Sequence, residues 1–104
     1  MANMSREELL KHVKLLCRIT TDDEGIKLEI ESLVDAAIHD LKLSGVRVEE
    51  PFVPLIIRAI GLYAKANFGF DNPDSEKLME SYRSLETHLA LSEEYCGVVV
   101  DETP

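Results

Sequence analysis

The hydrophobic side chains are most concentrated between Pro54 and Phe68, in the segment PLIIRAIGLYAKANF. At helical spacing, one apolar stripe consists of Val53, Ile56, Ile57, Ile60, Ala64 and Phe68, and a second flank consists of Leu55, Ala59, Leu62 and Ala66. Only Arg58 and Lys65 add charge to this segment. A helix that is apolar nearly all round must be covered from several sides, by helices of its own chain or by another subunit. Because a bilayer span requires roughly 20 apolar residues, the segment is predicted to be a core or interface helix.

Three further segments have one apolar face each and predict amphipathic helices. The first runs from about Arg6 to Cys17, and the second follows the acidic stretch Thr21–Glu24 and ends at Ser44 and Gly45. Apolar residues recur at helical spacing in both, as a single buried face requires. The third helix is predicted from about residue 73 to residue 91, and its buried stripe is predicted to be Leu78, Tyr82, Leu85 and Leu89.

Local signals mark the ends of these helices. Ser5 and Glu8 have the spacing of a capping box, in which each side chain accepts a hydrogen bond from the other residue's backbone N–H. Gly45 is suited to the left-handed conformation that often ends a helix. Before the last helix, Asn72 is predicted to be the N-cap, with Pro73 at the first helical position.

Together these elements predict an all-α fold, a small four-helix bundle with a central apolar helix and an extended C-terminal tail. The helical domain is expected to cover residues 1–92, and residues 93–104 are expected to form an acidic, flexible tail. In this tail Val98–Val100 have the composition of a strand that could join a neighbour's sheet edge, and a frayed terminus is the alternative. The linker before the apolar helix is predicted to be irregular because it contains Pro51, with at most a brief extended pairing at Val46 and Val48.

Net charge narrows the range of partners. The 104-residue chain carries a formal charge of −9, which argues against binding to nucleic-acid phosphates or to an anionic membrane surface. A helix-turn-helix regulator is disfavoured, because the exposed residues of the last two helices are mixed or acidic. The N-terminus lacks the basic and apolar stretches of an export signal, so the chain is expected to stay where it is made.

Candidate chemistry is sparse. Cys17 and Cys96 fit no metal-ligand spacing and are expected to be free thiols in a reducing cytoplasm. The three histidines, His12, His39 and His88, fall on three different predicted helices without a second ligand nearby. The acidic stretch before the second helix has Thr20 where a calcium loop requires aspartate, so helix capping explains it better. We therefore expect no enzymatic activity, no metal and no cofactor.

The residues expected to have a role lie on the apolar helix. Gly61, in the middle of this helix, indicates a close backbone approach, either to another helix or to another subunit. Arg58 and Lys65 are either solvated or paired with acidic groups of a neighbouring copy. The candidate residues for the core or a subunit interface are Ile56, Ile57, Arg58, Ile60, Gly61, Leu62, Tyr63, Lys65 and Phe68.

From Ala59 to Tyr95 the sequence AIGLYAKANFGFDNPDSEKLMESYRSLETHLALSEEY resembles the C-terminal half of the head–tail connector family of siphophages, often labelled DNA-packaging proteins. The upstream half is similar in a weaker pattern, with a short leucine-rich helix and a long helix that carries Ala36 and Ala37. The resemblance covers nearly the whole chain apart from the tail. It implies a non-enzymatic, all-helical adaptor that docks as a ring beneath the portal protein after DNA packaging and supports the next neck protein.

Two hypotheses follow from this resemblance and from the apolar helix. The first is a structural subunit of the phage neck, made in the host cytoplasm and incorporated into the virion, which completes the head and retains the DNA. Its partners would be the portal protein, a stopper or tail-completion protein, and further copies of itself, with DNA passing through without sequence-specific binding. A monomer in isolation is compatible with this hypothesis. The alternative is a monomeric helical adaptor or regulator that binds a single protein partner.

Overall fold

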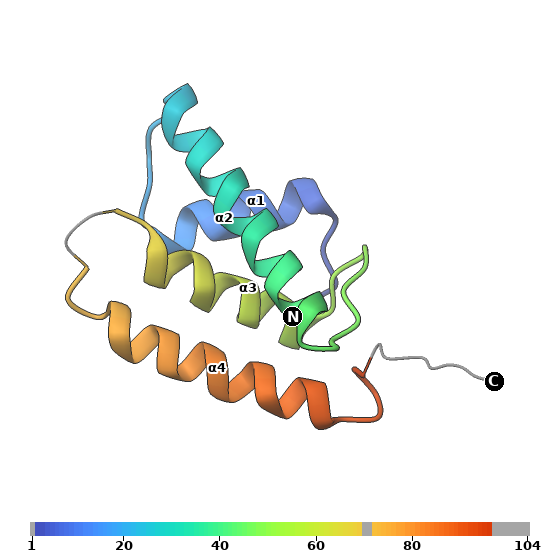
Figure 1. Ribbon diagram of the computed structural model, residues 1–104. Helices are drawn as coiled ribbons and strands as arrows, with labels where there is room; N and C mark the ends of the chain where they lie inside the picture. The colour runs from blue at the N-terminus through green and yellow to red at the C-terminus, as the bar shows by residue number, and fades with distance from the viewer. Residues whose placement is uncertain (1, 70–71, 97–104) are drawn as a thin grey trace.

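A computed structural model describes residues 2–69 and 72–96, and it confirms the predicted all-α class (Figure 1). Its helices are α1 (Arg6–Leu16), α2 (Glu24–Leu43), α3 (Pro54–Asn67) and α4 (Ser75–Leu91). Within the described ranges, the extended segments form only two isolated antiparallel bridges, Met4 with Phe52 and Val46 with Cys96. The predicted strand segment Val98–Val100 lies outside the described residues.

Helix α3 lies in the middle of the molecule and contacts each of the other three helices. Figure 1 shows α4 beside α3 and running in the opposite direction, with α1 and α2 on other sides. Seven residues of α3 are buried, namely Ile56, Ile57, Ala59, Ile60, Gly61, Ala64 and Ala66. The apolar helix is therefore covered from several sides by its own chain, as its composition requires.

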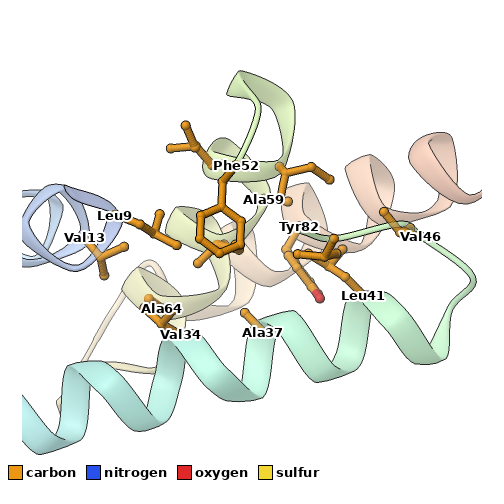
Figure 2. Packing of buried hydrophobic residues seen from close by; sticks show 14 of the residues in the cluster. Leu9, Val13, Val34, Ala37, Leu41, Val46, Phe52, Ala59, Ala64 and Tyr82 are labelled. Carbon is orange, nitrogen blue, oxygen red and sulfur yellow. The ribbon is translucent and has the colours of Figure 1, made fainter. Parts of the chain in front are cut away.

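The hydrophobic core is one cluster, to which all four helices and the linker before α3 contribute (Figure 2). The ring of Phe52, from this linker, lies among side chains of the helices in Figure 2. Tyr82 of α4 is also fully buried and points toward α2. Removing a large apolar side chain from water contributes about 1.5–3 kcal/mol, so the linker contributes to the stability of the bundle.

The predicted cap of α1 is confirmed. The Ser5 hydroxyl accepts a hydrogen bond from the Glu8 backbone N–H at 3.2 Å, and the Glu8 carboxylate accepts one from the Ser5 N–H at 2.9 Å. At the start of α2, one carboxylate oxygen of Asp23 accepts from the N–H groups of Gly25 and Ile26, at 2.8 and 3.1 Å. The acidic stretch before α2 therefore acts as a helix cap.

The start of α4 differs from the prediction. The helix begins at Ser75 with Asp74 as the N-cap, so Asn72 is not the cap and Pro73 is not the first helical residue. The Asn72 side chain makes other bonds, accepting from the Asp74 N–H at 3.0 Å and donating to the Lys65 carbonyl at 2.7 Å. Because its amide bonds to the last turn of α3, Asn72 closes the turn between the two helices instead.

Both ends of the described chain hold the linker in place. Gly45 takes a positive φ of 92° and ends α2 as predicted. Beyond it, the Arg47 N–H donates to the Tyr95 carbonyl at 2.8 Å. Further along, Phe52 exchanges two backbone hydrogen bonds with Met4, at 2.7 and 2.9 Å. The predicted extended pairing at Val46 thus occurs as a single bridge.

Candidate interaction surfaces

The nine predicted site residues divide between the core and the surface. Ile56, Ile57, Ile60 and Gly61 are buried, whereas Leu62, Tyr63 and Phe68 are half-buried, and Arg58 and Lys65 are exposed. The four buried residues thus belong to the core, whereas the exposed and half-buried residues on the outside of α3 remain accessible to another molecule. Contact of these residues with a second copy stays a prediction.

Gly61 lies where α3 contacts the Leu16 side chain of α1. A Cβ atom built at Gly61 would come within 2.7 Å of the Leu16 side chain, which is closer than two carbon atoms pack. This approach lies within one chain. It therefore agrees with a close approach to another helix of the same subunit as the reason for a glycine in mid-helix.

A shallow groove runs between α3 and α4 on the outside of the molecule. It has a volume of about 520 Å³, and it is lined by Arg58 and Leu62 from α3 and by Glu80, Ser84, Leu85 and His88 from α4. The floor contains the half-buried leucines Leu62 and Leu85. Such a groove suits a helix with an apolar face from another molecule.

Five leucines are exposed to solvent, and each of the four helices carries at least one. They are Leu15, Leu28, Leu43, Leu55 and Leu91. Leu55 lies one helical turn before Arg58, and Leu91 lies one turn after His88, so both extend the surface around the groove at one end. Leu28 and Leu43 lie on α2. Exposed apolar residues that extend a groove are a feature of protein-binding surfaces.

A second hollow, of about 330 Å³, lies between α1 and the start of α2. Its lining includes the lysines Lys11, Lys14 and Lys27 together with the carboxylates of Asp22, Asp23, Glu24 and Glu31. The Lys14 ammonium pairs with the Asp22 carboxylate at 3.0 Å. Charges of both signs therefore surround this hollow in nearly equal number.

Polar side chains connect the C-terminal end of α2 to α4 in the interior. The Tyr82 hydroxyl donates to the Asp40 carboxylate at 2.7 Å and lies 3.3 Å from an oxygen of Glu86. The Ser44 hydroxyl donates to the same Glu86 oxygen at 2.8 Å. Glu86 is only 7% exposed, and a buried carboxyl group without partners would be costly. The network therefore fixes how α2 and α4 pack against each other.

The pKa values of the two carboxyl groups in this network are shifted in opposite directions. Burial raises the pKa of Glu86 above its ordinary value, and its hydrogen bond to Asp40 raises it further. The same hydrogen bond is the largest cause that lowers the pKa of Asp40. Burial also raises the pKa of the Tyr82 hydroxyl, so this group stays protonated and donates.

These shifts predict a pH-dependent effect of Glu86→Gln. Because the pKa of Glu86 is raised on folding, its stabilising contribution is complete below the pKa of an unfolded glutamate and is lost as the pH rises through the raised value. Glutamine keeps a donor for Asp40 and an acceptor for Ser44 without a titrating group. We expect the free energy of unfolding of Glu86→Gln, relative to the native protein, to increase from pH 4 to pH 8, measured by urea denaturation.

The exposed Glu80 on the same helix provides a matched control. Glu80→Gln makes the same change at an exposed position outside the network, where only a small change in stability is expected. A Glu86→Gln protein whose difference from the native protein stays constant between pH 4 and pH 8 would contradict a raised pKa of Glu86.

One signal of this network is present in the sequence, although the network itself was not predicted. Glu86 lies four residues after Tyr82 and three before Leu89, both on the predicted buried stripe of α4. At helical spacing it therefore shares their face. Asp40, in contrast, lies beside the apolar face of α2, and nothing local in the sequence shows that Tyr82 reaches it.

Other candidate chemistry has no supporting geometry in the described residues. Among them, no group of three or more histidine, cysteine or acidic side chains is arranged to hold a metal ion. Cys17 and Cys96 are unpaired thiols, and burial raises the pKa of the Cys17 thiol. None of the helices in the described part of the chain is long and apolar enough to cross a membrane. The surfaces for protein contacts remain the main candidates.

Comparison with known proteins agrees with an interaction role. Residues 9–96 match the family of phage connector proteins, and this range includes all of α2, α3 and α4. No curated protein and no solved structure matches the chain. The match covers most of the sequence, including both helices that form the groove. The chain therefore belongs to the phage connector protein family, a family of structural proteins at the junction between phage head and tail.

Proposed function

We propose that the protein is a subunit of a ring in the phage neck, which docks on the portal protein and links the DNA-filled head to the tail. The observation that carries this proposal is the match to the phage connector family over residues 9–96. As a component of the virion junction, the protein interacts with other head or tail proteins. The portal on one side and a stopper or tail-completion protein on the other are the partners that we propose.

The surface of the subunit supports assembly into a ring. Exposed leucines on each of the four helices and a groove between α3 and α4 provide contacts in several directions. A head-to-tail contact between copies either closes into a ring or continues as a filament. Docking on the portal would select closure, because the portal fixes the copy number and the curvature.

Charge supports a role in which DNA passes through the ring without binding. The chain has a formal net charge of −9, whereas proteins that hold DNA neutralise its phosphates with clustered lysine and arginine. Repulsion between an acidic channel wall and DNA would reach about 8–10 Å at physiological salt. The completed neck would then retain DNA by closing the exit, with this ring as a section of the channel.

Electron microscopy of the purified chain mixed with its portal protein tests the proposal. We expect an additional ring beneath the portal, on the same symmetry axis. The chain alone serves as the control, and a monomer in that sample is compatible with assembly on a template. Portal particles that acquire no density under any assembly condition would contradict the proposed ring.

A further inference from the structure

The α3 side of the groove between α3 and α4 is cationic, in contrast to the acidic chain as a whole. Among the helices described in the structure, α3 is the one without a carboxylate, and it carries Arg58 and Lys65 seven residues apart on its outer row. On α4, Glu80 and His88 line the groove, and Lys77 lies one turn before Ser81 of the same lining. A groove with leucines in its floor and cations on its α3 rim fits an acidic segment with exposed apolar residues.

The outward surface of α2 has these properties. Five of its residues lie on one row at steps of three and four, and all are exposed: Leu28, Ser32, Ala36, His39 and Leu43. Leucines thus lie at both ends of the row, and small or polar residues lie between them. The helix as a whole carries five carboxylates against two lysines. Glu29 and Asp35 are exposed on the two flanks of the row, and the Asp35 carboxylate pairs with Arg6 of α1 at 2.8 Å.

The two surfaces lie on different sides of the subunit. In Figure 1, α3 lies between α2 and α4, and the outer row of α2 consists of residues that do not face α3. A groove on one side and a complementary helix on another side allow each copy to contact two neighbours. Such a contact is heterologous, as a ring of identical subunits requires.

We propose that the outer row of α2 in one copy docks into the α3–α4 groove of the next copy, so that the two surfaces form the subunit contact. This inference depends on the proposed ring and assigns its interface. Leu28 buries its side chain on the floor of the groove, and Glu29, beside it on the flank of the row, faces Arg58 and Lys65. Opposite charges at the rim orient the helix and reject other registers.

Two exposed substitutions test the assignment without disturbing the core. Arg58→Glu reverses a charge of the groove, and Leu28→Lys places a cation on the row that enters it, at a position that is 61% exposed. Each change alone is expected to weaken the association between copies by about 10- to 100-fold. Lys11→Glu is the matched control, since it reverses a charge on α1 outside both surfaces. Circular dichroism checks that each full-length variant is folded.

A mixture of the two variants provides the sharper measurement. Each variant keeps one intact surface, so an equal mixture contains pairs in which an intact α2 row meets an intact groove. We expect chemical cross-linking, with and without the portal protein, to recover pairs in the mixture that neither variant forms alone. Recovery of this kind requires two different surfaces in the contact.

The outcomes separate this inference from the proposed function. If Arg58→Glu or Leu28→Lys forms rings as well as the Lys11→Glu control, or if the mixture recovers no pairs, the assigned interface is wrong while the ring stands. If the native chain gives neither cross-linked copies nor a ring with the portal protein, the proposed ring fails. Loss in both single variants with recovery in the mixture supports the assignment.

Discussion

Replacing Tyr82 by alanine is expected to lower the free energy of unfolding by about 3–5 kcal/mol, because it removes a large buried ring and leaves a cavity. The side chain is fully buried. Its ring packs edge-to-face on Tyr63, with centroids 5.2 Å apart and planes at 65°. Alanine would also remove the donor of the 2.7 Å hydrogen bond to Asp40. Urea denaturation followed by circular dichroism measures the loss.

Tyr82→Phe separates the ring from the hydroxyl. Phenylalanine preserves the packing on Tyr63 and removes only the donor shared by Asp40 and Glu86, at a cost of about 1–3 kcal/mol. The difference between the two variants then measures the packing. If phenylalanine costs as much as alanine, the hydroxyl network and not the buried ring is the main contribution of this position.

Helix positions were largely predictable from the sequence, because their causes are local. The segment around Ile57 is apolar at helical spacing on nearly every side. Its composition therefore predicts a helix that is buried by neighbours, whatever the arrangement of the other helices. The Ser5–Glu8 capping box and Gly45 mark helix ends through contacts within a few residues. For the same reason, the first three helices begin or end within about one residue of their predicted limits.

Features that depend on distant contacts could not be predicted in this way. Asn72 has the composition of an N-cap, yet its amide bonds to the Lys65 carbonyl at the end of α3. In the turn after α1, Arg18 has a positive φ of 58°, a conformation for which glycine is the usual signal. The backbone N–H of the buried Ile19 bonds to the Lys14 carbonyl in this turn. Tertiary packing thus decides both features.

The candidate surface was predictable only as a set of residues on one helix. The sequence placed Arg58, Leu62 and Lys65 on α3, but the groove exists because α4 lies beside them with Leu85 and His88. Pairing between helices is not encoded in the periodicity of either one. The row on α2 likewise belongs to the polar side of a predicted amphipathic helix. Its leucines can contact another molecule only because the opposite face of α2 packs on the core.

Replacing Gly61 by valine is expected to destabilise the protein by about 2 kcal/mol, because added atoms in a packed interior force neighbouring groups to move. Glycine in mid-helix costs about 1 kcal/mol relative to alanine, so valine relieves part of that cost. A Cβ atom would lie 2.7 Å from a terminal methyl group of Leu16, which can rotate away, but the two further methyl groups of valine also need space at this buried position, so we expect a net loss. Chemical denaturation of Gly61→Val measures the net effect.

A double-mutant cycle with Leu16→Ala identifies the cause. If the Leu16 side chain is what valine displaces, Leu16→Ala should cost about 1 kcal/mol less in the Gly61→Val protein than in the native one. Leu10→Ala is the matched control, because Leu10 is also half-buried on α1 but lines the hollow beside α2. Its effect should add to that of Gly61→Val. Additivity at Leu16 as well would mean that the Leu16 side chain is not what valine displaces.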